Sequence, residues 1–434
     1  MTATQDLGWS QRLQELRHLT DPEMDELVDR YRRDHPEVGD VRSLVLQMLR
    51  ELGEAKANPG RRPATTAGQA GERLSSLLDP PPLPPWAKDK ALITRGQGLF
   101  VDSGLYQAVA LFFASLPMAY AAKDGGAQAL ASVSDLATSN LTRRVAETGQ
   151  MLIDVMGVRS PDALEPGGTG YATATGLRLL HACVRVILLD PDNSEPWPEA
   201  ELGPPVNQEL LLATLLDFTI VTWRAMERMG VELEEENRKA HLYTWSVIGY
   251  LMGLDACQQG PLTLEDIDEI SRLLSGRLGP TESGRRLMAA LLAEMEEFMG
   301  LGWRKLPVSL IHWLFRDAPY GVDRVPEYLS VGRPAWWAVP LFGSLRTASR
   351  LDWLLGPVRP IPRLLIRKAG RYMLLAYADR YAGRTLPFRI PDELARSWRV
   401  RQGPVAKKVR EQRRKVRHRV RNRPGGPLRA KGVR

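Results

Sequence analysis

The chain has 434 residues, of which 44% are hydrophobic and 25% charged, and its net charge is +8. This composition is ordinary for a globular protein and argues against a wholly disordered or fibrous chain. Its two cysteines, Cys183 and Cys257, are too few for a disulfide framework and lack the spacing of a metal site, so we expect a reducing compartment.

The charge is unevenly distributed along the chain. Residues 399–434 contain fifteen Lys and Arg residues and one acid, a net charge of +14, which leaves −6 for residues 1–398. We expect either a disordered, solubilising tail or a segment that contacts an anionic membrane. No aromatic residues alternate with these basic residues, so the tail gives no support for nucleic-acid binding.

The N-terminal part, residues 8–53, predicts two short amphipathic helices. Asp21 and Pro22 are a suitable N-cap and first residue for the second helix. Residues 1–11 lack a basic patch followed by an apolar run, so we expect no secretory or twin-arginine signal. The expected location is therefore cytoplasmic, with possible peripheral contact to a membrane.

A segment rich in Gly, Ala, Thr, Arg and Pro, residues 54–85, predicts a linker before a long helical region that starts near Trp86. The uncharged run at residues 103–122 is long enough to span a membrane. It contains Gln107 and Pro117, however, and no cluster of charges flanks it. We therefore expect a buried core helix.

Further helices are predicted by apolar spacing and by capping residues. One begins after Asn207 and stops at Gly230, and the next, over 234–253, opens with acids that suit a helix N-terminus. Two more are expected at 263–277 and 281–300. No run alternates apolar and polar residues for long enough to indicate a sheet, so the predicted fold class is all-α.

The C-terminal part, residues 301–398, combines tryptophans with many arginines and prolines. It predicts irregular helical packing around the core, or a surface that meets an apolar substrate or a membrane interface. The expected organisation is an N-terminal helical extension, a linker, one helical domain, a C-terminal helical extension and a basic tail, at residues 1–53, 54–85, 86–300, 301–398 and 399–434.

The residues with the clearest chemical meaning lie at 173–190. His181 falls on the apolar face of a predicted helix, with Arg178 three residues before it and Arg185 four residues after it. Two positive charges would keep a buried imidazole neutral, which is the form that binds a metal, and would themselves need anions. Haem supplies both an iron and two propionates. From the residues alone, a hydrogen-bonded core histidine remains the alternative.

Three segments in order carry a resemblance to a known family: LHACVRVILLD at 180–190, GPPVNQELLLATLLDF at 203–218 and AHLYTWSVIGYLMGLD at 240–255. They resemble the rubber oxygenase (latex clearing protein) family, which includes the fungal oxygenase of mycophenolic acid biosynthesis. The resemblance covers about residues 85–300. It implies an all-helical, globin-like core with one haem b, in which His181 is the axial ligand. From their placement three residues before and four residues after His181, we expect Arg178 and Arg185 to hold the propionates.

The resemblance also implies a distal motif, Arg-x-x-Lys-Thr, about thirty residues before the axial histidine. Arg144, Glu147 and Thr148 match it, with glutamate in place of lysine. These three residues would position O2 and manage protons, and Glu147 could act as the base. The alternatives for Glu147 are a solvated helix face or an ion pair with Arg143 or Arg144.

Other candidates are weaker. His241 and Trp245 share a helical face and are expected to pack in the core, and His312 is a minor candidate for a second ligand. The glycine-rich run at 167–176 lacks a preceding strand and the spacing of a nucleotide loop.

The implied reaction is O2-dependent oxidative cleavage of a carbon–carbon double bond in an isoprenoid or another apolar substrate. Without an export signal, a small terpenoid or lipid is a more consistent substrate than polyisoprene. The alternatives are a non-catalytic haem sensor or carrier, and a haem-free interaction protein on the same fold.

Overall fold

The computed structural model describes residues 8–48 except 40, 42 and 46, and then 82–133, 141–193, 196–299, 305–338 and 342–343, without the side chains of 133, 141–146 and 297–299. All of them belong to the first of the two units into which the chain divides, Met1–Phe388. Most of the predicted linker, most of the C-terminal extension and the whole basic tail lie outside the described residues. The domain boundaries and the role of the tail therefore stay predictions.

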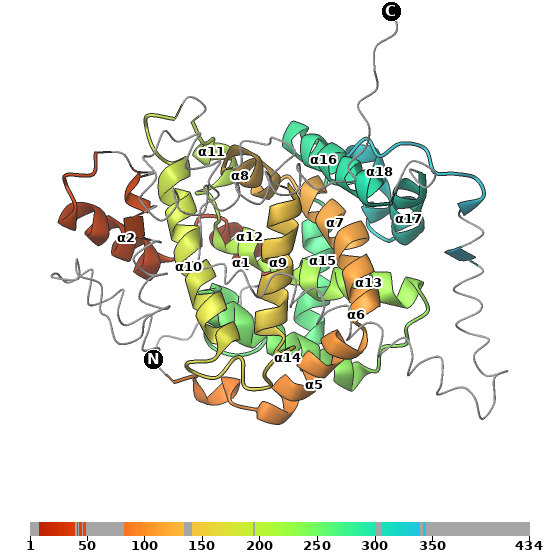
Figure 1. Cartoon of the computed structure of the whole chain (residues 1–434), viewed down its shortest axis with the longest axis horizontal. Helices are drawn as coiled ribbons and strands as arrows, with labels where there is room; N and C mark the ends of the chain where they lie inside the picture. Colours follow the sequence, from red (N-terminus) through yellow and green to blue (C-terminus); the bar gives the residue numbers. More distant parts are fainter. Residues whose placement is uncertain are drawn as a thin grey trace, which may run out of the picture. The chain divides into compact units, whose positions relative to one another are not determined.

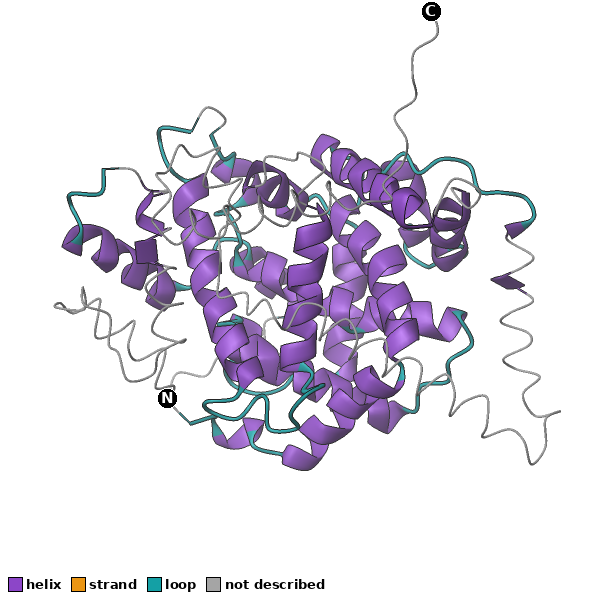
Figure 2. Cartoon of the chain, in the orientation of Figure 1, coloured by secondary structure: helices purple, strands orange, loops and turns teal. Residues whose placement is uncertain are grey.

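Helices make up nearly all the regular structure in the described part of the chain (Figure 2). No strand occurs there, and the backbone bridge between Ala122 and Leu278 is isolated. The predicted all-α class is confirmed. Besides the helices introduced below, the described elements are α1 (Trp9–Leu16), η1 (Pro85–Ala87), α8 (Gly126–Val133), α11 (Glu199–Leu202), η4 (Asp255–Cys257), α17 (Lys305–Phe315), η6 (Val322–Arg324) and α18 (Val325–Tyr328).

The centre of the structure is α14 (Glu235–Leu251), which is buried along almost its whole second half. A helix that is apolar on all sides belongs inside a protein. Its nearest neighbour is α5 (Lys90–Asp102), and the two helices lie together in Figure 1. Gly96 of α5 allows this approach, because a Cβ there would overlap the Thr244 hydroxyl and the Ala240 carbonyl.

The uncharged run at 103–122 forms α6 (Gly104–Ala110), the π-helical turn η2 (Leu111–Ser115) and α7 (Leu116–Ala121). Pro117 explains the wider turn, because proline has no N–H for the carbonyl four residues back and its ring crowds that carbonyl. The stretch Gly104–Ala121 is long and apolar enough to cross a membrane, which core helices of globular proteins also are. It packs against α12, α13 and α16, as expected for a core helix.

The helix predicted from Asn207 to Gly230 is two helices, α12 (Gln208–Phe218) and α13 (Ile220–Arg228), so that prediction is wrong in its middle. The predicted ends are confirmed, since the Asn207 side chain accepts from Leu210 N at 3.0 Å and Gly230 has φ +91°.

The backbone turns at Thr219, where φ is −111° and ψ is −94°. The carbonyl of Asp217 accepts hydrogen bonds from the hydroxyls of Ser115 (2.6 Å) and Thr222 (2.8 Å). Side-chain hydroxyls therefore satisfy a helical carbonyl at the break.

The other predicted helices are confirmed. The second N-terminal helix is α2 (Pro22–Asp34), with the Asp21 side chain accepting from Met24 N and proline at the first position. The helices expected after α14 are α15 (Leu264–Ser275) and α16 (Glu282–Met299).

The close approach of α5 and α14 predicts that Gly96→Ala destabilises the protein. We expect a loss of about 1–3 kcal/mol in the free energy of unfolding, because the new methyl group must push two helices apart. The measurement is urea-induced unfolding followed by circular dichroism. Gly98→Ala on the same helix is the matched control. No atom lies within 4 Å of its added Cβ, so it should be neutral or stabilising. Equal stability of the two variants would contradict this packing.

Candidate functional site

Helix α10 (Thr169–Leu188) carries three of the predicted site residues and lies beside α9 (Leu141–Val155) and α2 (Figure 1). Gly170 lets the start of α10 approach the end of α9, since a Cβ there would lie 2.7 Å from the Asp154 carbonyl oxygen. The Thr173 hydroxyl donates to the Asp154 carboxylate at 3.0 Å. The two helices are therefore fixed to each other at this end.

His181 on α10 is half-buried. Its Nδ1 is buried and has no hydrogen-bond partner. Its Nε2, in contrast, keeps accessible surface. The pKa of His181 is lowered to about 4, mainly by burial and also by the charge of Arg185, while Asp21 opposes the shift. The ring is therefore neutral at neutral pH and can offer a nitrogen lone pair to a metal.

The face of α10 that carries His181 differs from the predicted one. Leu177 and Val184, on the same face, are also only half-buried, whereas Leu179 and Cys183 are fully buried on another side. Leu188, the fourth residue of this face, is buried, so the face predicted to point into the core is buried at its C-terminal end and half-buried at the other three positions. The His181 face keeps accessible surface.

Arg178 and Arg185 contact carboxylates of the N-terminal part of the chain. Arg178 donates from Nε and Nη2 to Asp21 at 2.5 and 2.8 Å, and from Nη2 to Glu23 at 2.9 Å. Arg185 donates from Nε to Asp25 at 2.7 Å. The anions that these buried charges require come from α2 and its cap, so a propionate would have to compete for each guanidinium. Their role as propionate ligands stays a prediction.

Asp21 was predicted only as a helix cap, and Glu23 and Asp25 had no predicted role. The sequence did contain one signal: two arginines on an apolar helix require acidic partners if they are buried. A single sequence does not show which of its 51 acidic residues supplies them.

The predicted distal residues lie on α9. Glu147 is half-buried and interacts with a neighbouring group, so it is not a free carboxylate. Thr148 is exposed, which gives no support to a catalytic role for it. The Arg144 side chain lies outside the described residues. The structure places α9 against α10, and the three catalytic roles stay predictions.

His241 and Trp245 are core residues, as predicted. His241 is fully buried, its Nδ1 accepts from Trp223 Nε1 at 3.1 Å, and burial lowers its pKa to about 3. Trp245 stacks on Phe218 with 4.5 Å between ring centroids. Their packing joins α14 to α12 and α13.

Three further side chains can be set aside as reactive groups. Cys183 and Cys257 are free and buried, and burial raises the pKa of each thiol to about 12, so neither is a ready nucleophile. His312 Nε2 lies 2.9 Å from the Gly332 carbonyl oxygen, so that ring already has a partner within the chain.

Asp124, which is buried, and Asp217, which is half-buried, are two carboxyl groups that had no predicted role. Burial raises the pKa of Asp124, and burial together with the neighbouring Asp124 raises that of Asp217 well above its usual range. The Asp124 side chain accepts from Gly126 N at 3.0 Å. The surroundings of Asp217 therefore disfavour its charged form.

His181 would be able to hold the iron of a haem, because it offers one neutral nitrogen donor. Among the described residues, no group of three or more His, Cys, Asp or Glu side chains could hold a metal ion by itself. A metal at His181 would need most of its ligands from a macrocycle such as porphyrin, with Nε2 as the protein donor. Ligating histidines ordinarily donate from their other nitrogen, and Nδ1 of His181 has no such partner.

The fold and the site define an all-α protein whose core helix carries a neutral histidine suited to metal ligation. The family model of the ER-bound oxygenase mpaB/B'/rubber oxygenase catalytic domain matches residues 102–354, which is more than half of the chain. The chain belongs to this family, as the resemblance predicted. The matched region includes both α9 and α10.

Two relatives agree with this assignment. The rubber oxygenase of Streptomyces sp. (strain K30) is 26% identical over 267 residues, which are 61% of this chain and 60% of that protein. The match therefore spans less than two thirds of that relative. The solved structure of the latex clearing protein LCP in its closed state covers 83% of this chain and 91% of its own, with a TM-score of 0.58 and 19% identity. At that identity, the similarity shows a shared fold.

The lowered pKa of His181 predicts a pH dependence of stability in the haem-free protein. The unfolded chain binds a proton at this histidine below about pH 6.5, whereas the folded chain does so only near pH 4, so stability falls as the pH drops between these values. Between pH 7 and 5 the expected loss is at most about 2 kcal/mol.

Urea unfolding at pH 7 and pH 5 measures this contribution. His181→Gln should lose less stability over this interval than the wild type. His18→Gln removes an exposed histidine and should keep the wild-type dependence. If His181→Gln and the wild type lose the same free energy of unfolding between pH 7 and pH 5, the pKa of His181 is not lowered by burial in the folded protein.

Proposed function

We propose that this chain is a haem-b-dependent oxygenase that uses O2 to cleave a carbon–carbon double bond in an isoprenoid or a similarly apolar substrate. Membership of an oxygenase family supports the reaction class. The observation that carries the proposal is His181, which is neutral at neutral pH, accessible at Nε2 and located on a core helix.

The residues around His181 suit this role. Arg185 and poor hydration keep the imidazole in the form that donates a lone pair. Leu177 and Val184 give the same face of α10 an apolar, partly accessible surface that would exclude water. Glu147, on the adjacent α9, is the carboxylate that we propose as a proton acceptor. Haem bound at His181 would supply the iron needed for O2 chemistry.

The substrate proposal is a terpenoid or lipid of modest size. The similar Streptomyces protein is named a rubber oxygenase. We match Glu147 of this chain to the lysine of the family motif, which would make the proposed distal side different here. Incubating the haem-loaded protein under O2 with short isoprenoids and with polyisoprene, and detecting carbonyl products, would separate the two substrate sizes.

A second candidate function is a haem-free interaction protein on the same fold. The observation that favours it is the pairing of Arg178 and Arg185 with acids of α2 and its cap, with which a propionate would have to compete. A third reading, a haem sensor or carrier without turnover, would show the haem spectrum but no product.

The proposed ligand predicts that His181→Ala loses haem. Purified wild-type protein should be red with a Soret band, and the variant should retain little or none of it at equal folded content, because the iron loses its protein donor. His18→Ala, which removes an exposed histidine, is the control and should keep the spectrum. Full haem retention by His181→Ala would overturn the assignment. A colourless wild type that cannot be reconstituted would favour the haem-free function.

If Glu147 faces the haem iron, we expect it to leave the iron able to bind an added ligand. Glu147→Lys should shift the haem spectrum toward a six-coordinate, low-spin form, because a neutral amine is a stronger iron ligand than a carboxylate. Thr148→Lys is the matched control, since it places the same amine at the adjacent exposed position and should leave the spectrum unchanged. Identical spectra for both variants would show that Glu147 does not face the iron.

A further inference from the structure

The segment Arg17–Asp25 brings three carboxylates to two arginines of α10. Asp21 makes a bidentate pair with Arg178 at 2.5 and 2.8 Å, and Glu23 adds a contact to the same guanidinium at 2.9 Å. Asp25 lies 2.7 Å from both Nε and Nη2 of Arg185. Three negative charges thus surround two positive ones.

These pairs lie on both sides of His181 along α10. Arg178 precedes it by three residues and Arg185 follows it by four, so each pair is about one helical turn away. The side chains of Asp21 and Arg185 are only 6% and 3% exposed. Their partners Arg178 and Asp25 are 23% and 27% exposed, so these ion pairs are partly buried. Breaking either pair would leave a buried charge, Asp21 or Arg185, without its partner. Glu23 is 63% exposed and contributes less.

The same segment is tied to two other helices through Gln208 at the start of α12. The Gln208 backbone N–H donates to the Leu19 carbonyl at 2.9 Å, and its side chain donates to the carbonyls of Thr20 (2.8 Å) and Gly253 (3.0 Å). Its side-chain oxygen accepts from Asp255 N at 2.8 Å. The segment is therefore anchored to the ends of α12 and α14 as well as to α10.

The local backbone is shaped around both ion pairs. At Gly253 a Cβ would overlap Arg178 Nε and would lie 2.5 Å from Asp21 Oδ2, and φ is +76°. Val206 has φ +51°, which is costly for a β-branched residue, and its carbonyl accepts from Arg185 Nη1 at 3.0 Å. Gly253 leaves room for the Arg178–Asp21 pair, and the carbonyl of Val206 accepts a further hydrogen bond from Arg185.

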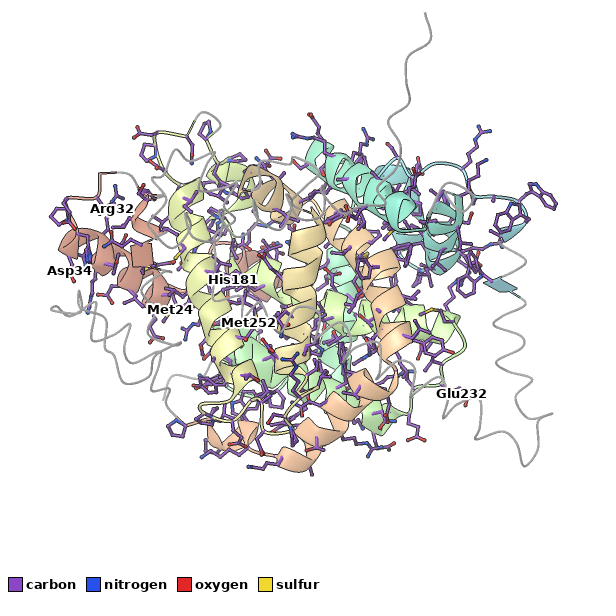
Figure 3. The ribbon with its side chains drawn as sticks, in the orientation of Figure 1. Met24, Arg32, Asp34, His181, Glu232 and Met252 are labelled. Atoms are coloured by element: carbon purple, nitrogen blue, oxygen red, sulfur yellow. The ribbon has the colours of Figure 1, made fainter. Side chains whose placement is uncertain are left out.

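We infer that Arg17–Asp25 is a positioning element for His181. Its carboxylates neutralise Arg178 and Arg185 and thereby fix the two turns of α10 that carry the histidine. In Figure 3, His181 lies on α10 and Met24 on α2, the helix packed against it. Asp21 and Asp25 are positioning residues that act through the arginines. The inference rests on the proposed function only where it concerns haem.

The test uses the full-length protein and the double variant Asp21→Asn/Asp25→Asn. In the haem-free protein, hydrogen exchange of residues 177–185 should be about ten- to hundredfold faster than in the wild type, because two charge-assisted contacts are lost. In the haem-loaded protein, the iron–histidine stretching frequency should shift and haem should dissociate at least about tenfold faster.

Asp34→Asn is the matched control, because it makes the same charge change on the same helix at an exposed position. Figure 3 shows Asp34 at the opposite end of α2 from Met24. It should leave exchange, the iron–histidine frequency and haem dissociation unchanged. Asp25→Glu keeps the charge and should recover most of the wild-type behaviour. A general structural role would alter stability without moving the iron–histidine frequency.

Wild-type exchange in 177–185 together with wild-type haem dissociation in the double variant would overturn the inference. If the double variant does not fold, the single variant Asp25→Asn decides by the same two measurements. If wild-type protein takes up no haem, the proposed function fails. Exchange in residues 177–185 of the haem-free protein then still decides whether this segment positions the helix.

Discussion

The pairing of two arginines on α10 with acids from α2 and its cap is the constraint on which the site depends. A helix that is apolar on most sides cannot bury Arg178 and Arg185 without partners. The ion pairs of these arginines determine where the N-terminal segment lies. The Arg178 pair leaves room only for glycine at position 253, and Arg185 also donates to the carbonyl of Val206, whose φ is positive. His181 lies between the two pairs and stays neutral because it is poorly hydrated and has a guanidinium beside it.

The helical fold was largely predictable from the sequence because its signals are local. Helix caps such as Asp21 and Asn207 depend on the chemistry of a few neighbouring residues, and both act as predicted. The break at Thr219 was not predictable in this way. It coincides with a hydroxyl from Ser115, about a hundred residues earlier in the chain, bonding the Asp217 carbonyl.

The site was predictable only in part, for a related reason. Motif order identified His181 and its two flanking arginines, and the family assignment confirms the resemblance on which that order relied. Spacing on α10 showed which residues share a face, but it did not show that this face would stay partly accessible. The partners of the arginines lie more than 150 residues away in sequence, where no local pattern reaches them.

The long sequence distance between these partners affects how the protein folds during synthesis. Arg17 and Asp21 leave the ribosome long before Glu209 and Gly253, which they contact in the folded chain. At the usual pace of synthesis the delay is roughly ten to fifty seconds. Until then α1 has neither α12 nor α15 to pack against, and α2 must wait for α10. The contacts that join it to the rest of the protein can form only late in co-translational folding.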